Sequence, residues 1–279
     1  MIPVATLLAA CTARVTGESI RFANVTPGSP ETIAGTLVRP PGTGPFPAVV
    51  QLHGCEGIQN KSFRWARWFA ERGYVSLVVD SVGRRGTRTD CRSGPDDPPP
   101  TARLDDAFGG LQYLQSRPFV RGDRVAAIGW SQGGAYAMAV VNGPSLERAG
   151  RRGVRLPAIG FAAAIGAYPG GCFSLVQEQV VRPLLVLIGE ADDWTPAAAC
   201  REMVQAMRAR GADASIVTYP GAHHYFDVEG QSLEVLSHVE NDLKPGGYGA
   251  TVAYDAAAAA DAQRQIDAFL ARHLKGPRP

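Results

Sequence analysis

The chain has 279 residues, of which 45% are hydrophobic, and a formal net charge of +2 at pH 7. The length suits one large α/β domain or two small ones, and the hydrophobic content excludes a disordered chain. The balanced charge argues against a nucleic-acid binder. No apolar run reaches the length of a membrane span, and the five cysteines lack the C-x-x-C spacing of a zinc ribbon.

The start of the chain differs from the rest. Residues 1–16 are expected to form a leader or an apolar tail, followed by a single domain over residues 17–279. The apolar stretch ends in LAAC, which places Cys11 where a bacterial lipoprotein signal carries its lipid anchor. This pattern predicts export to the periplasm or envelope. No Lys or Arg precedes the stretch, so a cytoplasmic protein with an apolar tail is the alternative.

Predicted strands and helices alternate along the domain. Residues 18–25 and 33–39 are expected to form an antiparallel hairpin around a Pro/Gly turn. Apolar runs and helical spacing then predict strands over 48–53, 74–80, 124–130, 158–167, 184–189 and 214–219, helices over 62–72, 101–116, 132–141, 196–210 and 254–274, and loops over 81–100, 143–157 and 227–249. This alternation favours a mostly parallel sheet with helices on both faces.

The clearest motif is a G-x-S-x-G sequence that places Ser131 between the predicted strand 124–130 and the helix after it. In that context the serine stands on a sharp turn and acts as a nucleophile. Glycines around it leave room for the strained backbone. The amide of Gln132, at the helix start, is expected to stabilise an oxyanion. The alternative is a chance turn in a chain with 32 glycines.

A serine nucleophile needs a base and an acid that orients the base. The chain order serine, acid, histidine favours His223 or His224, which follow the last predicted strand; the residues alone do not separate the two. Asp192 and Asp193 follow the strand 184–189 and are the candidate acids, although either could instead cap the next helix. A triad explains these residues better than a metal site, and no cofactor is expected.

A second oxyanion donor is expected in the HGCEG loop after the strand 48–53, from the backbone amide of Cys55. The alternative is that the Cys55 thiol is itself a nucleophile, but it has no elbow motif around it.

The motifs LHGCEG, GWSQGG, GEADDWTP and YPGAHHYF resemble, in this order, the dienelactone hydrolase branch of the α/β-hydrolases over about residues 20–275. The resemblance implies the α/β-hydrolase fold, with Ser131 as nucleophile, Asp192 as acid and His224 as base. The enzymes that name the family use a cysteine nucleophile. The serine here therefore favours a general carboxylic ester hydrolase that acts on small esters or lactones through an acyl-enzyme.

The resemblance also implies that arginines bind a substrate carboxylate. Arg84 or Arg85 could do so here, and a solvated loop arginine is the alternative. The aromatic residues beside the predicted catalytic positions could line a substrate pocket, although core packing is expected for at least two of those aromatics: Trp130, Trp194, Tyr225 and Phe226.

Cys172 and Cys200 follow neighbouring predicted strands, and a disulfide between them is expected if the protein is exported. Cys55 and Cys91 form a second, less supported pair. Two other functions are carried as alternatives, a serine peptidase of the prolyl-oligopeptidase type and a non-catalytic envelope scaffold.

Overall fold

The computed structural model of the chain describes residues 16–83, 85, 86, 91–94 and 99–276. Cys11, almost all of the predicted leader, and Arg84 lie outside these described residues.

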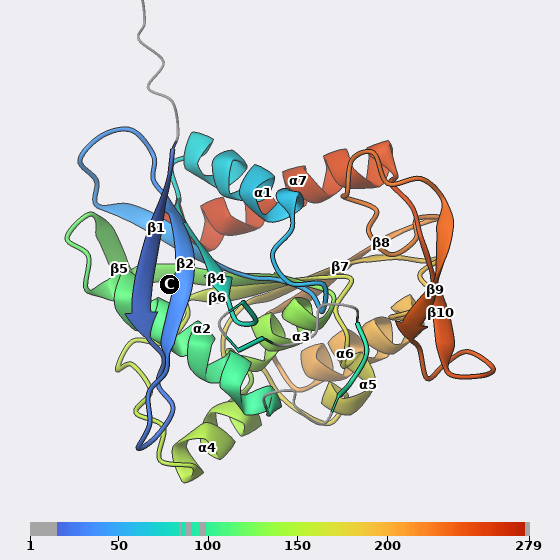
Figure 1. Cartoon of the computed structure of the whole chain (residues 1–279), viewed down its shortest axis with the longest axis horizontal. Helices are drawn as coiled ribbons and strands as arrows, with labels where there is room; N and C mark the ends of the chain where they lie inside the picture. Colours follow the sequence, from blue (N-terminus) through green and yellow to red (C-terminus); the bar gives the residue numbers. More distant parts are fainter. Residues whose placement is uncertain (1–15, 84, 87–90, 95–98, 277–279) are drawn as a thin grey trace, which may run out of the picture.

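An eight-stranded sheet with the order β1-β2-β4-β3-β5-β6-β7-β8 forms the centre of the structure (Figure 1). Antiparallel pairing joins β1 to β2 and β2 to β4, and the other neighbouring strands are parallel. The strands are β1 (Gly17–Ala23), β2 (Thr32–Val38), β3 (Phe46–Leu52), β4 (Val75–Asp80), β5 (Val120–Trp130), β6 (Ala163–Ala167), β7 (Leu184–Gly189) and β8 (Ala214–Tyr219). The mostly parallel sheet and the opening hairpin confirm the predicted fold.

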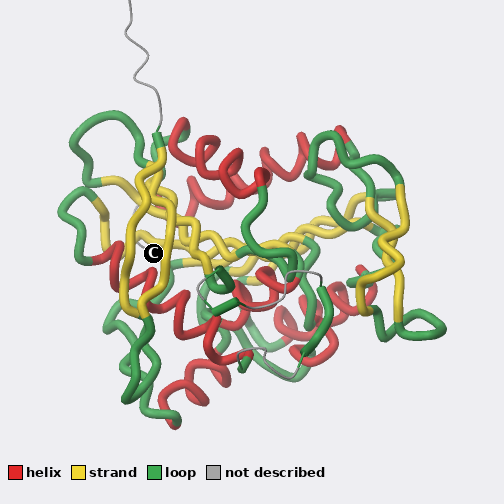
Figure 2. Tube along the Cα trace, viewed as in Figure 1, coloured by secondary structure: helices red, strands yellow, loops and turns green. Residues whose placement is uncertain are grey.

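Helices cover both faces of the sheet (Figures 1 and 2). One face is covered by α1 (Asn60–Glu71) and α7 (Ala256–Leu270), and a last helical turn, η1 (Ala271–Lys275), follows α7. The helices on the other face are α2 (Pro100–Gln115), α3 (Gln132–Ala139), α4 (Gly143–Arg151), α5 (Cys172–Leu175) and α6 (Ala197–Ala209). None of the helices in the described part of the chain has the length and apolarity needed to span a bilayer.

The inner strands are mostly apolar because neither of their faces meets water. All six residues of β7, with the sequence LLVLIG, are buried, as a parallel strand between two helical layers requires. Most of β1, at the edge of the sheet, is exposed.

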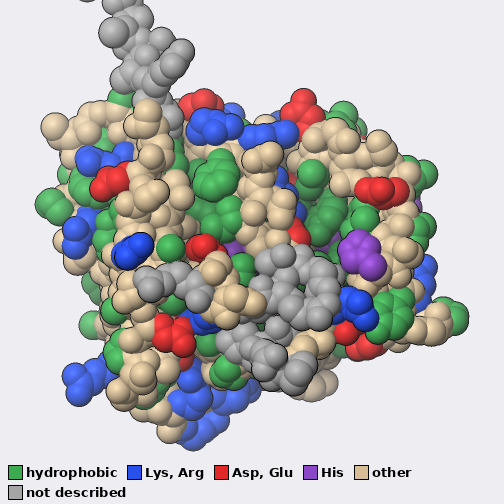
Figure 3. All heavy atoms as spheres, viewed as in Figure 1, with side chains coloured by type: hydrophobic (Ala, Val, Ile, Leu, Met, Phe, Trp, Pro, Cys, Tyr) green, Lys and Arg blue, Asp and Glu red, His purple; other side chains and the backbone are tan. Residues whose placement is uncertain are grey.

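The predicted loop over 143–157 is wrong in its first half, which forms α4. The side chain of Asn142 caps this helix by accepting a hydrogen bond from the Ser145 amide at 2.9 Å. The Asn-Gly-Pro start resembles a turn, although Asn at the cap and Pro in the first turn also suit a helix start. Lys and Arg side chains gather over the edge of the molecule where α4 lies (Figure 3).

The predicted loop over 227–249 is also wrong, because it contains strand β9 (Glu234–Glu240), which pairs with β10 (Tyr248–Val252) as a separate antiparallel hairpin. Most of β9 is exposed, so it lacks the apolar alternation that marks a half-buried strand. The strand predicted over 158–167 is shorter than expected and forms only β6.

The carboxyl ends of parallel strands share one edge of a sheet, where α/β proteins bind ligands. The four predicted site segments follow β3, β5, β7 and β8. The sheet therefore brings together residues that are more than 160 positions apart along the chain.

Candidate active site

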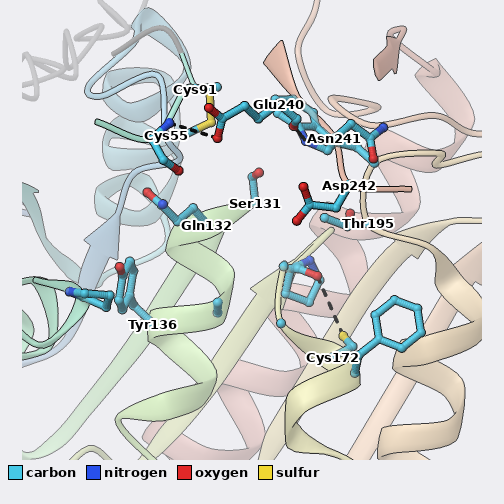
Figure 4. A pocket seen from close by; sticks show the side chains of 18 of the residues that line it. Cys55, Cys91, Ser131, Gln132, Tyr136, Cys172, Thr195, Glu240, Asn241 and Asp242 are labelled. Atoms are coloured by element: carbon cyan, nitrogen blue, oxygen red, sulfur yellow. Dashed lines mark hydrogen bonds between the residues drawn. A yellow bond between two sulfur atoms is a disulfide. The ribbon is translucent and has the colours of Figure 1, made fainter. Parts of the chain in front are cut away.

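Ser131 occupies a strained turn between β5 and α3. Its φ of 54° and ψ of −121° lie in a region that non-glycine residues rarely adopt. The Ser131 amide donates to the Ala167 carbonyl at 2.9 Å, which fixes the turn to β6. A side chain at Gly129 or Gly133 would collide with backbone atoms. Ser131 lies near the centre of a cavity, with Gln132 beside it (Figure 4).

His224 and Asp192 form a buried hydrogen-bonded pair, with 2.8 Å between His224 Nδ1 and Asp192 Oδ2. The Thr195 hydroxyl donates to Asp192 Oδ2 at 2.9 Å, and the amides of Trp194 and Thr195 donate to Asp192 Oδ1. These contacts fix the carboxylate, so the proton of the neutral imidazole is on Nδ1 and the lone pair is on Nε2. His224 Nε2 is buried and forms a hydrogen bond with none of the described residues, Ser131 included.

The neighbouring candidates point elsewhere. His223 Nδ1 lies 3.0 Å from the carbonyl of Ala191. Asp193 bonds Thr251 and Lys244 instead of a histidine. Burial tends to raise the pKa of Asp193, but the hydrogen bonds from Lys244 and Thr251 outweigh it and lower the pKa. Of the two histidines and two acids left open by the sequence, the structure pairs His224 with Asp192.

The loop that carries Cys55 is tied down at the carbonyls that precede it. His53 Nδ1–H donates to the Gly54 carbonyl at 2.7 Å, and Arg103 donates to the His53 carbonyl. His53 Nε2 accepts from the Ser81 amide at 3.2 Å, which fixes this tautomer. Burial and then the charge of Arg103 lower the pKa of His53 to about 4, so the ring is neutral at pH 7.

Arg103 also donates to the side chain of Gln132, the residue that would supply the other oxyanion amide. Its guanidinium packs 4.6 Å from the ring centroid of Tyr136. One buried arginine therefore bridges the segments of both predicted oxyanion donors, and Figure 4 shows Cys55 and Gln132 on the same side of Ser131.

A cavity of about 740 Å³ opens around Ser131. One part of its wall is polar and includes Arg92, Arg103, Gln132, Glu240 and Asp242. The other part is mostly apolar and includes Ala135, Pro169, Phe173, Ala199 and the two cysteines Cys172 and Cys200. Figure 4 shows Cys172 on the opposite side of the cavity from Glu240 and Asn241, which come from the end of β9 and the turn after it.

Both conceivable disulfides are formed, Cys55–Cys91 and Cys172–Cys200. The first joins the predicted oxyanion loop to Cys91, which falls within the predicted loop over 81–100, and the second joins α5 to α6. Because Cys55 has no free thiol, it cannot be the alternative nucleophile. The close group of Cys55, Glu56 and Cys91 likewise offers no thiolate to a metal ion.

Of the described residues predicted to line the pocket, Trp194 does so, whereas four do not: Trp130, Tyr225, Phe226 and Arg85. Trp130 is buried and donates to Asp227, and the Tyr225 ring packs against Lys61 with 4.1 Å between Nζ and the ring centroid. Arg85 forms ion pairs with Asp106 and Glu31, which use its charge within the protein.

Sequence reasoning missed Arg103 and the hairpin residues Glu240, Asn241 and Asp242. Arg103 stands one helical turn before Ala107, on the buried face of α2, and a charge at that position could have marked it. The hairpin residues carry no motif, and their place at the cavity depends on how the hairpin packs.

Comparisons with known proteins agree with this fold. A model of the dienelactone hydrolase family matches residues 33–274. A Bradyrhizobium sp. protein named "Probable 2-oxo-3-(5-oxofuran-2-ylidene)propanoate lactonase" is 25% identical over 197 residues, 68% of this chain and 77% of the relative. Dipeptidyl peptidase 8 of Homo sapiens is 32% identical over 124 residues, 38% of this chain but only 13% of the peptidase.

Among solved structures, a thermophilic esterase from Thermogutta terrifontis with propionate bound superposes with a TM-score of 0.65. The two are 18% identical, and the match covers 95% of this chain and 97% of the esterase. The strand order and the turn at Ser131 define the α/β-hydrolase class. Within that class the chain belongs to the dienelactone hydrolase family. The resemblance seen in the sequence and the class of carboxylic ester hydrolases are thereby confirmed.

Proposed function

We propose that this protein is a serine-dependent hydrolase of small carboxylic esters or lactones that works through an acyl-enzyme. The observation that carries the proposal is the buried bond between His224 and Asp192, on the same sheet edge as the strained Ser131. Scaffold stability requires neither the strained serine nor a buried histidine with an unbonded Nε2.

In the first half of the reaction, Ser131 Oγ attacks the carbonyl carbon and His224 Nε2 takes the serine proton. The bond to the leaving oxygen then breaks, and His224 returns the proton to that oxygen. Asp192 stabilises the imidazolium between these steps. The Ser–His contact is expected to tighten when substrate binds, since such contacts are often long in the free enzyme.

In the second half, water attacks the acyl-enzyme while His224 again acts as the base, which releases the acid and restores Ser131. The amides of Cys55 and Gln132 would bind the negative oxygen in both halves. Removing one such donor slows turnover by roughly 100- to 1000-fold in serine hydrolases.

Small esters and lactones suit the size of the cavity, because drug-sized ligands occupy pockets of roughly 300–1,000 Å³. The lactone reading is supported by the name of the Bradyrhizobium relative.

The proposal is tested by hydrolysis of nitrophenyl acetate. Ser131→Ala and His224→Gln should each reduce turnover to the residual rate that substrate binding alone supports. Asp192→Asn should lower kcat by about 10⁴-fold, because the imidazole then adopts the wrong tautomer. Activity that survives in Ser131→Ala would exclude the proposal.

A serine peptidase is the second candidate, favoured by the partial match to dipeptidyl peptidase 8. Matched nitrophenyl ester and nitroanilide substrates separate the two functions. An esterase should cleave the ester and leave the anilide intact; cleavage of the anilide would favour the peptidase.

We further propose that the protein is exported, with a lipid anchor at Cys11. Two disulfides support an oxidising compartment. Labelling with radioactive palmitate, followed by membrane fractionation, should show a labelled wild type and an unlabelled Cys11→Ser. Equal labelling of both, or of neither, would exclude the anchor.

A further inference from the structure

Asp227 is a buried carboxylate outside the proposed triad, and it accepts three hydrogen bonds from aromatic side chains. Trp130 Nε1 and Trp65 Nε1 donate to Asp227 Oδ2 at 2.8 and 2.9 Å, and the Tyr168 hydroxyl donates to Asp227 Oδ1 at 2.7 Å. Asp227 is 8% exposed, and Tyr168 is fully buried. Hydrogen bonds to a charged acceptor in such surroundings are strong and directional.

The donors come from separate parts of the fold. Trp65 lies on α1, Trp130 ends β5 immediately before Ser131, and Tyr168 follows β6. Asp227 itself comes three residues after His224. One carboxylate therefore connects the segment of the nucleophile to the segment of the base.

Tyr168 extends this connection to the imidazole. Its ring centroid lies 4.5 Å from that of His224, and the Trp194 ring lies 4.8 Å from His224. Tyr168 also has a φ of 37°, unusual for a residue with a side chain, so its position needs support from its contacts. Burial and then the negative charge of Asp227 raise the pKa of Tyr168, and its hydroxyl stays a donor.

We propose that Asp227 is a positioning residue, which holds the Tyr168 ring against His224 and the end of β5 beside Ser131. The inference rests on the proposed function, because it assigns Asp227 a task in the same catalytic site. Asp227 touches neither substrate nor a reacting atom in this account. It acts through Tyr168 and Trp130.

A matched pair of variants tests this role. Tyr168→Phe and Trp65→Phe each remove one neutral donor to Asp227, but only Tyr168 contacts His224. Both variants are assayed with nitrophenyl acetate, and the active fraction is counted by titration with a fluorophosphonate. Counting active sites separates lost positioning from lost folded protein.

Tyr168→Phe should lower kcat per active site by about 10- to 100-fold, the range expected when a catalytic group is misplaced by up to about 1 Å. KM should stay within about twofold, since ground-state binding is unaffected. Trp65→Phe should keep kcat within about twofold while lowering the melting temperature. Asp227→Asn has one acceptor oxygen and cannot accept from Tyr168 and the two tryptophans together, so it should lose at least as much kcat as Tyr168→Phe.

Equal kcat per active site in Tyr168→Phe and Trp65→Phe would overturn the inference, because Asp227 would then serve stability alone. That comparison decides the matter even if Asp227→Asn does not fold. Failure of the wild type to react with the fluorophosphonate would end the proposed function and this inference together. Normal labelling and turnover in all three variants would end the inference only.

Discussion

Arg103 shows how one side chain can organise two halves of a site. It bonds the His53 carbonyl and the Gln132 side chain at once, and its burial lowers its pKa. Lysine carries its three donors on one nitrogen, whereas the guanidinium uses two nitrogens to reach Gln132 and the His53 carbonyl, so lysine cannot reproduce this bridge.

Arg103→Met should therefore lower kcat by about 10- to 100-fold, less than the loss of a whole oxyanion donor. Arg103→Lys should keep a higher kcat than Arg103→Met but a lower one than the wild type. Added guanidinium should partly restore the kcat of Arg103→Ala. Arg117→Met is the control, because Arg117 also packs on a tyrosine ring, 4.7 Å from Tyr113, but far from the cavity. Steady-state kinetics that show equal activity in Arg103→Met and Arg117→Met would contradict this role.

His53 gives the stability of the fold a pH dependence. Its pKa is lowered from 6.5 to about 4 by burial and by Arg103, so only the unfolded chain binds a proton between these values. The contribution of His53 to the free energy of unfolding is fully present above pH 6.5. It is lost as the pH falls, and the loss reaches about 3 kcal/mol at pH 4.

Urea unfolding of the wild type and of His53→Gln between pH 7 and pH 4 measures this contribution. The stability difference between the two proteins should shrink by about 3 kcal/mol as the pH falls. His238→Gln, at an exposed position on β9, should follow the wild type. If the difference in free energy of unfolding between the wild type and His53→Gln does not change with pH, His53 is not the source of the pH dependence.

At the scale of elements, the disulfide Cys55–Cys91 joins the predicted oxyanion loop to a segment that bonds the β9–β10 hairpin. The Glu240 amide donates to the Cys91 carbonyl at 3.2 Å, and the Ser93 amide donates to Glu240 Oε2 at 2.9 Å. Figure 4 shows Cys91 beside Glu240 above Ser131. The hairpin is thus coupled to the segment that carries one of the two proposed oxyanion donors.

Removing each disulfide by paired Cys→Ser changes should lower the free energy of unfolding by about 2–4 kcal/mol. The pair at 55 and 91 should also lower kcat more than the pair at 172 and 200, because only the first bond holds an oxyanion amide. Denaturation curves and kinetics of the two double variants check this. A larger loss of kcat in the second pair would contradict the coupling.

At the scale of the whole molecule, the fold was predictable because each inner strand and each covering helix has its own local pattern. The site segments were predictable for a similar reason, since Ser131 has a contiguous motif and the acid and base follow strands in a set order. The residues alone left His223 and His224 open. The resemblance to the family implied His224, and the structure pairs this histidine with Asp192.

The parts that were missed depend on contacts between distant segments. Asp227 and Trp65 are 162 residues apart, and nothing near either residue marks the bond between them. The β9–β10 hairpin was missed because β9 is mostly exposed and lacks the apolar alternation of a half-buried strand. Arg85 was a candidate for substrate binding because the resemblance implies arginines in that role, whereas the structure uses its charge in ion pairs with Asp106 and Glu31.

The central claim is that distant segments meet so that Ser131 becomes a nucleophile. The most direct measurement is peptide mapping by mass spectrometry after incubation with a fluorophosphonate. The account predicts a single adduct on the peptide that contains Ser131, formed in the wild type and absent from Ser131→Ala and His224→Gln. An unmodified wild type, or an adduct on any other residue, would contradict it.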